Sequence, residues 1–260
     1  SEDPSTSPYF LNPDGSYTYF GRTNWVDEAY NDVGFSTIHN IDISGKTDRI
    51  SYYFSGGYNR QNGMFKYGND IYNRYNLRTK LQFKLTDWWS LNSNVSLTTS
   101  DYDYANAMTN TYRQMYRKNP MDMVKNPDGT WTDASVDTLG ALAEGGRATD
   151  WKTNTNINLS TKIDVIKDVF FVQGTFAFSN TKTRSNWYNL PVTYRNGPEL
   201  PVLTFNPIST VSDASSSNSD TKHILFDVYG TFQKTFAKKH AVTAVVGFNQ
   251  EEYKYDYVKA

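Results

Sequence analysis

The chain has 260 residues, enough for one large domain or two small ones, and it contains no cysteine, which excludes disulfides, thiolate metal sites and a thiol nucleophile. Its net charge of −1 comes from 26 Lys and Arg against 27 Asp and Glu, so it lacks the positive charge expected of a nucleic-acid-binding protein. A mean hydropathy of −0.67 excludes a run of ~20 apolar residues that would span a membrane as a helix, whereas 16% aromatic residues argue against disorder.

Alternation of apolar and polar residues predicts eight β-strands, because successive side chains of a strand point to opposite faces. The clearest segment runs from Asn73 to Thr86, where the odd positions are mostly apolar and the even positions are mostly cationic or polar. In chain order the predicted strands are residues 35–44, 50–60, 73–86, 89–104, 151–165, 169–180, 222–236 and 242–257.

The connections between these strands alternate in length. Short turns are predicted at residues 45–49, 87–88, 166–168 and 237–240, and long connections at 61–72, 105–150 and 181–221, with one helix-like stretch at 112–124. An up-and-down sheet then carries every short turn at one end and every long loop at the other, which is typical of a transmembrane β-barrel with long extracellular loops. A soluble β-sandwich is the alternative, although its strands are usually shorter.

The alternation also predicts which side chains would face lipid and which would face a water-filled lumen. The expected lipid-facing residues are Leu77, Leu81, Phe83, Ile157, Leu159, Phe176 and Phe226. The expected lumen-facing residues are Arg74, Arg78, Lys80, Asn156 and Asp227.

The cationic row predicts an all-β, open and curved antiparallel sheet and not a closed barrel. Eight strands can close, but the narrow interior would then crowd unpaired charges such as Arg74, Arg78 and Lys80. We therefore expect the first strand (35–44) and the last (242–257) each to have one unpaired edge. Residues 1–34 are expected to form an extracellular lead-in, and residues 35–260 a partial barrel domain.

The sequence offers little catalytic or metal-binding chemistry, and we expect neither an enzyme nor a metal or cofactor site. His39, His223 and His240 are far apart, and no hydrolase, metalloprotease or phosphate-loop motif is present. Asp101 and Asp103 could ligate a hard cation, but a solvated strand end is the favoured interpretation. Two similar segments, 12–17 and 126–131, carry Asn-Pro-Asp-Gly and predict tight turns; a calcium or sugar contact is the less favoured interpretation.

Aromatic residues cluster in or beside the long loops. Such side chains suit glycans or peptides, because they combine apolar area with hydrogen-bonding tips; a membrane-interface girdle is the competing interpretation. The candidate ligand-contacting residues are Tyr102, Tyr104, Tyr112, Tyr116, Trp131, Trp187, Tyr188 and Tyr194.

An ordered series of short motifs extends this pattern. Thr23-Asn24-Trp25-Val26-Asp27-Glu28 precedes His39-Asn40-Ile41-Asp42-Ile43-Ser44-Gly45, followed by Tyr52-Tyr53-Phe54-Ser55-Gly56-Gly57-Tyr58 and Arg74-Tyr75-Asn76-Leu77-Arg78. In this order, over residues 20–100, they resemble the barrel of SusC/RagA-like TonB-dependent transporters of Bacteroidetes outer membranes.

This resemblance implies a 22-stranded outer-membrane barrel with an N-terminal plug that imports oligosaccharides or peptides, driven by TonB and capped by a SusD-like lipoprotein. The chain departs from that pattern in having neither plug nor TonB box, so it is expected to be a fragment. A small eight-stranded outer-membrane barrel with an adhesin or structural role and a soluble carbohydrate-binding β-domain are the alternatives.

Overall fold

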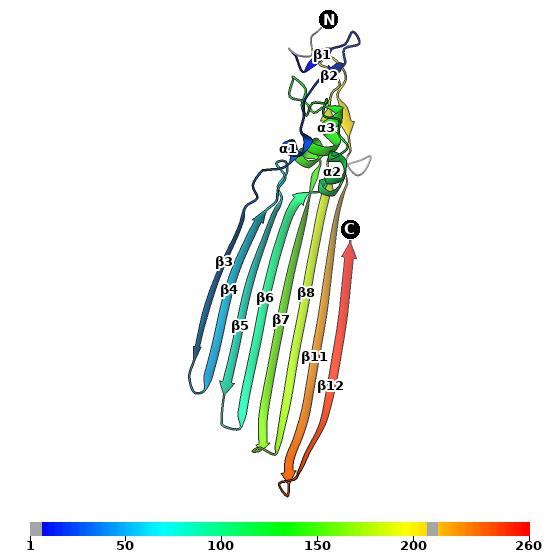
Figure 1. Cartoon of the computed structure of the whole chain (residues 1–260). Helices are drawn as coiled ribbons and strands as arrows, with labels where there is room; N and C mark the ends of the chain where they lie inside the picture. Colours follow the sequence, from blue (N-terminus) through cyan, green and yellow to red (C-terminus); the bar gives the residue numbers. More distant parts are fainter. Residues whose placement is uncertain (1–6, 207–212) are drawn as a thin grey trace.

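The computed structural model describes residues 7–206 and 213–260. Its main feature is one antiparallel sheet of eight strands in the order β12-β11-β8-β7-β6-β5-β4-β3, drawn in Figure 1. The strands are β3 (Ser36–Lys46), β4 (Ile50–Asn62), β5 (Ile71–Lys84), β6 (Trp89–Ala105), β7 (Gly146–Ile166), β8 (Phe170–Asn189), β11 (Ala214–Phe236) and β12 (His240–Lys259). The prediction of an all-β, up-and-down sheet with alternating short and long connections is therefore confirmed.

Several strands are longer than the sequence pattern predicts. β7 begins at Gly146, β8 continues to Asn189 and β11 begins at Ala214, so two predicted connections shorten to residues 106–145 and 190–213. Pairing with a neighbour extends these strands, because Thr183 lies opposite Ser219 and Lys152 in segments with little apolar alternation. Residues 1–6 of the predicted lead-in and residues 207–212 of the predicted connection 181–221 lie outside the described residues.

The sheet is open, as predicted. β3 and β12 are the outer strands, and within the described residues each pairs with one neighbour only, β4 and β11 respectively. β12 is exposed along its whole length. An unpaired edge presents free backbone donors and acceptors to any further strand.

The long connections fold together into a compact unit at one end of the sheet, opposite the short turns (Figure 1). This cap comprises residues 7–35, 63–70, 106–145 and 190–206. Its elements are β1 (Tyr9–Leu11), β2 (Tyr17–Tyr19), α1 (Trp25–Ala29), α2 (Met108–Met115), α3 (Asp133–Ser135), the π-helical turn η1 (Val136–Gly140), α4 (Ala141–Glu144), β9 (Val192–Tyr194) and β10 (Leu203–Phe205).

The helical content of the cap corrects the sequence prediction. The helix expected at 112–124 is α2, which begins at Met108 and ends at Met115. The helix could not have extended through Asn119, because Pro120 disfavours helical backbone in the residue that precedes it. The helices α1, α3 and α4 were not predicted, since each is too short to show a helical period.

Apolar side chains from three separate segments hold the cap together. Trp25 of α1, Met115 of α2 and Leu139 of η1 are buried in one cluster that also includes Val192. The Trp25 indole Nε1 donates to the carbonyl of Asn119 at 2.9 Å. Each fully buried aliphatic side chain contributes about 1.5–3 kcal/mol, so the cap has a core of its own.

Polar contacts tie this cap to the sheet. Asn106 Nδ2 donates to Asn189 Oδ1 at 2.7 Å, and Asn189 Nδ2 donates to Asp213 Oδ1 at 2.6 Å. The backbone N–H of Leu190 donates to the carbonyl of Gly145 at 3.1 Å. The ends of β6, β7 and β8 are therefore linked where the cap begins.

The two Asn-Pro-Asp-Gly segments form the tight turns that the sequence predicts. In both, a glycine has a φ of 83°, and an aspartate Oδ1 accepts from the backbone and hydroxyl of the residue two positions later, at 2.9 and 2.6 Å. The first turn joins β1 to β2, and the second separates the bridged residues Lys125 and Trp131. These contacts explain the Asn-Pro-Asp-Gly sequences as turns, and no bound calcium or sugar is needed to explain them.

Within the described residues, no helix combines the length and apolar composition that crossing a membrane would require.

Gly146 provides a test of how the cap joins the sheet. Its φ is 110°, and a Cβ there would lie 2.1 Å from the Tyr188 carbonyl oxygen. We expect Gly146→Ala to destabilise the junction by at least about 1–3 kcal/mol, since both backbone strain and the clash oppose it, and to increase protease cleavage within residues 106–145. Gly129→Ala is the matched control, because Gly129 also has a positive φ of 83° but nothing within 4 Å of its Cβ position. Equal protection of the two variants would contradict this account.

Candidate functional site

Strand register divides the side chains of the sheet between two faces. Phe176 lies opposite Leu159 and Phe226, and Leu77 lies opposite Leu97. All seven residues expected to face lipid share this apolar face, which carries exposed side chains such as Leu77, 59% exposed. The five residues expected to face the lumen, Arg74, Arg78, Lys80, Asn156 and Asp227, share the opposite face, which we call the polar face. Which medium each face contacts stays a prediction.

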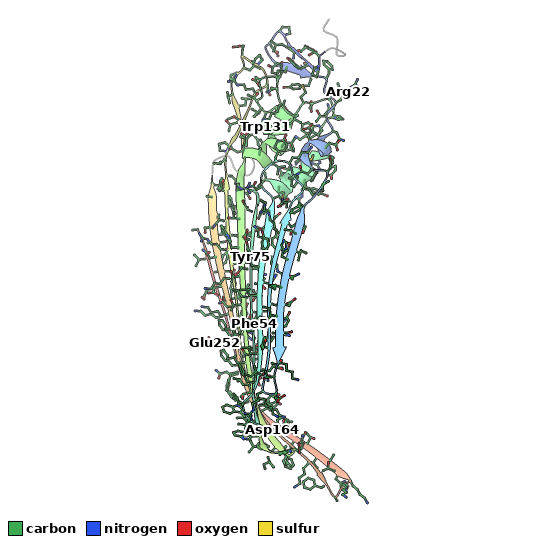
Figure 2. The ribbon with its side chains drawn as sticks, turned by 90° about the vertical axis from the view of Figure 1, so that its left-hand side faces the viewer. Arg22, Phe54, Tyr75, Trp131, Asp164 and Glu252 are labelled. Carbon is green, nitrogen blue, oxygen red and sulfur yellow. The ribbon has the colours of Figure 1, made fainter. Side chains whose placement is uncertain are left out.

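Figure 2 views the sheet from its edge, and side chains project from both faces along its length. On the polar face, amide and hydroxyl groups of β5, β6, β7 and β8 bond to one another. The bonds join Thr98 to Asn76 at 3.1 Å, Asn156 to Ser96 at 3.4 Å, and Ser179 to Asn156 at 2.9 Å. This part of the polar face is hydrophilic without being strongly charged.

Cationic side chains interrupt the amide network at β5. Arg74 Nε donates to Asn76 Oδ1 at 3.1 Å, and Arg78 Nε donates to Asn94 Oδ1 at 3.2 Å. The Lys80 ammonium lies 5.9 Å from the centre of the Tyr53 ring. These three predicted lumen residues therefore have neutral partners.

Asp227 and Asn156 differ in how many of their polar atoms have hydrogen-bond partners. Asn156 uses both its amide nitrogen and its oxygen in bonds with neighbouring strands. Asp227 has one buried carboxylate oxygen, Oδ1, without a hydrogen-bond partner among the described residues. It lies between Thr175 and Asn249 in the register of the sheet.

Two of the aromatic candidates form a stack at the cap end of the polar face. The rings of Tyr102 and Tyr104 lie 4.5 Å apart with an interplanar angle of 23°. The Tyr102 hydroxyl donates to Asp70 Oδ1 at 2.8 Å, and the Tyr104 hydroxyl donates to Asp150 Oδ2 at 3.1 Å. These two hydrogen bonds to carboxylates hold both phenol side chains in position.

Tyr72 and Asp70 lie beside the Tyr102–Tyr104 stack but were not predicted from the sequence. The Tyr72 ring meets Tyr102 edge to face at 6.2 Å, and both line a hollow of about 380 Å³ with Asp70 and Gln61. Tyr72 was assigned to a connection, although its even position next to Arg74 is the signal that places it on the polar face. Asp70 carries no such signal, because it precedes β5.

Trp187 extends this aromatic group, whereas Tyr188 does not. Tyr104 lies opposite Ala148, which lies opposite Trp187, so Tyr104 and Trp187 occupy one row of the polar face. Tyr188 follows Trp187 in the strand and points to the apolar face, where it is 42% exposed. Tyr112 and Tyr116 lie apart on and beside α2, exposed, with their rings edge to face at 5.8 Å.

Trp131 and Tyr194 are part of the cap core. Trp131 is 4% exposed, its indole Nε1 donates to Glu144 Oε1 at 2.9 Å, and Lys125 Nζ lies 3.0 Å from its ring centre. Tyr194 packs against the same cluster. Trp131 therefore packs the cap core in this structure, and a contact with a ligand stays a prediction.

The acidic residues considered for cation binding already have partners. Asp103 Oδ1 accepts from Arg147 Nη2 at 2.6 Å, and Asp101 Oδ2 accepts from Asn73 Nδ2 at 2.9 Å. In residues 7–206 and 213–260, no group of three or more His, Asp or Glu side chains is placed to hold a metal ion.

Burial and hydrogen bonding shift several pKa values in the cap. Burial raises the pKa of the Tyr19 phenol, whose hydroxyl donates to Asn126 Oδ1, to about 12. Burial also lowers the pKa of Lys125. Hydrogen bonds from Ser16 and Thr130 lower the pKa values of Asp14 and Asp128, because these bonds stabilise the ionised carboxylates.

Comparisons with known proteins agree with the motif resemblance. No family model matches the sequence. The chain is 23% identical over 238 residues to the TonB-dependent receptor P39 of Formosa agariphila, a match that covers 89% of this chain and 21% of the relative.

Solved structures match the fold. A structure of the RagAB peptide importer in the closed-closed state aligns with a TM-score of 0.69 at 17% identity, covering 96% of this chain and 27% of that chain. A structure of the RagAB peptide transporter gives a TM-score of 0.68 at 18% identity, covering 92% of this chain and 26% of that chain. The chain spans about a quarter of the length of these structures, and it resembles TonB-dependent outer-membrane transporters, as the ordered motifs indicated.

Truncating Trp131 tests its structural role. We expect Trp131→Ala to destabilise the cap by about 3–5 kcal/mol, the usual cost of removing a buried Trp, and so to increase proteolysis of residues 106–145 at constant temperature. Tyr116→Ala is the control, since Tyr116 is 64% exposed. A cap that resists protease equally in both variants would show that Trp131 does not support it.

Proposed function

We propose that these residues form part of the barrel wall of a TonB-dependent outer-membrane transporter. In this proposal the whole protein imports oligosaccharides or peptides, and a SusD-like surface lipoprotein docks over the cap end. Coupling to TonB requires a region outside these residues. We expect no catalysis, because the relatives named above are a receptor and a transporter.

The observation that carries this proposal is the amphipathic open sheet. One face presents exposed apolar side chains from β3 to β12, including Ile41, 66% exposed, and Val246, 80% exposed. The other presents hydrogen-bonded amides, hydroxyls and cations. A wall between lipid and a water-filled lumen needs this division, since a charge facing lipid near the midplane costs ~2–4 kcal/mol.

We infer the substrate classes from the aromatic residues at the cap end of the polar face. The Tyr102–Tyr104 stack, with Tyr72 and Trp187 nearby, offers aromatic surface beside fixed carboxylates. Such surfaces suit sugars and peptides alike. RagAB, whose structure matches this fold, is a peptide importer.

The two alternatives account for fewer of these features. A small eight-stranded barrel requires β3 to pair with β12, and within the described residues both strands keep a free edge. A soluble carbohydrate-binding domain would need a second layer over the apolar face.

Uptake measurements test the proposed transport. In cells that carry the complete protein, accumulation of labelled oligosaccharides or peptides should fall to background when either this protein or TonB is deleted. A strain with the complete protein restored is the control. Uptake that continues without TonB would contradict the proposal.

A pair of substitutions tests the orientation of the wall. Leu81 and Lys80 are neighbours in β5 on opposite faces. Leu81→Arg should sharply reduce the folded protein recovered from the outer membrane, because it places a charge against lipid at ~2–4 kcal/mol. Lys80→Leu should leave that amount nearly unchanged, and similar losses in both variants would overturn the assignment of faces.

A further inference from the structure

Within the described residues, four cations of β5 and β7 on the polar face lack a carboxylate partner. Arg74, Arg78 and Lys80 of β5 and Lys152 of β7 form this cationic strip, and none of them makes an ion pair within the described residues. Arg74 and Lys152 flank Ser100 in one row of the sheet. At about 3.4 Å per residue, Arg78 lies about 14 Å from Arg74 along the strand and Lys80 about 7 Å further.

The carboxylates nearest the strip are already engaged. Asp42 lies in the row of Arg78, two strands away, and accepts from the Tyr53 hydroxyl at 2.7 Å. Asp150 accepts from the Tyr104 hydroxyl. Four cations against these two carboxylates leave the strip with a net positive charge, which an added anion would neutralise.

The surroundings favour a mobile, hydrated ligand over a protein surface seated permanently on the strip. Stable protein interfaces have an apolar core depleted of charged residues. Here the groups beside the cations are polar: Asn76 accepts from Arg74, Asn94 accepts from Arg78, and Asn156 donates to Ser96. Such amides and hydroxyls can form hydrogen bonds with the hydroxyls of a sugar in place of those with one another.

The strip is continuous with the aromatic stack above it. Tyr102 follows Ser100 on the polar face of β6, and Ser100 lies between Arg74 and Lys152. A sugar chain could therefore stack on Tyr102 and Tyr104 while the charged groups of its next units meet the guanidinium and ammonium groups below.

From these observations we propose that the polar face selects anionic oligosaccharides, whose carboxylates or sulfates pair with Arg74, Arg78, Lys80 and Lys152. This inference rests on the proposed function and narrows its substrate class. Arginine is suited to this contact, because its planar fork matches the geometry of an oxyanion.

Equilibrium binding to the complete, detergent-solubilised protein tests the inference without transport. The probes are oligogalacturonates and chondroitin sulfate oligomers, each compared with its neutral form, the methyl ester or the desulfated and carboxyl-reduced oligomer. The acidic form of at least one pair should bind at least tenfold more tightly, and its affinity should fall as salt is added. Equal affinity of acidic and neutral forms in both pairs would overturn the inference.

Substitutions test whether the cationic strip causes the preference for the acidic oligosaccharide. Arg74→Gln, Arg78→Gln and Lys80→Gln together should abolish the preference for the acidic form, whereas Arg74→Lys with Arg78→Lys should keep most of it. The control is Lys167→Gln, Lys238→Gln and Lys239→Gln, which removes the same charge from exposed residues at the short turns. A preference that survives the first triple variant, or is lost equally in the control, would overturn the assignment to the strip.

Two further comparisons complete the test. One distinguishes a sugar from an acidic peptide as the ligand, and the other distinguishes failure of this inference from failure of the proposed function. Tighter binding of oligoglutamate than of either acidic oligosaccharide would overturn the choice of a sugar. Preferential binding of an acidic oligosaccharide by a protein whose uptake does not need TonB would uphold the inference and refute the proposed function.

Discussion

An exposed apolar face is the constraint on which the rest of the structure depends. A sheet in a soluble domain buries such a face against a second layer, but along most of this sheet no described element packs on either side (Figure 2). Phe54, Leu77 and Phe248 thus remain 45%, 59% and 59% exposed. In the proposed wall, a lipid medium would remove the cost of this exposure, and a water-filled lumen would account for the cations and amides on the other face.

The cap follows from the same constraint at the end of the sheet. Near the cap, β8 and β11 carry polar residues on both faces, so these strand ends would gain little stability from lipid. Buried side chains such as Trp25, Met115 and Leu139 supply a local core instead, and the Asn106–Asn189–Asp213 contacts join it to the strands. Rigid support of this kind positions the Tyr102–Tyr104 stack at the entrance to the polar face.

The sequence predicted the sheet wherever a strand is apolar on one face only. In β5 and the lower part of β7 the period of two is explicit, and the strands, their faces and the open edges were predicted from it. The upper parts of β8 and β11, such as Ala214–Thr221, carry polar residues on both faces, and pairing with neighbours alone makes them strands. Local pattern cannot reveal a ladder that depends on register with distant residues. The same limit applies to Trp131, whose burial depends on packing between segments of the cap.

Cysteine scanning of β7 in the complete protein, freed of other cysteines and held in its native membrane, tests directly whether the two faces meet different media. This part of the chain has no cysteine of its own, so each introduced thiol reports one position. A membrane-impermeant thiol reagent should label cysteines at Asn154, Asn156 and Asn158 but not at Thr155, Ile157 and Leu159. Equal labelling at all six positions, or labelling confined to the second set, would contradict an amphipathic wall between lipid and water.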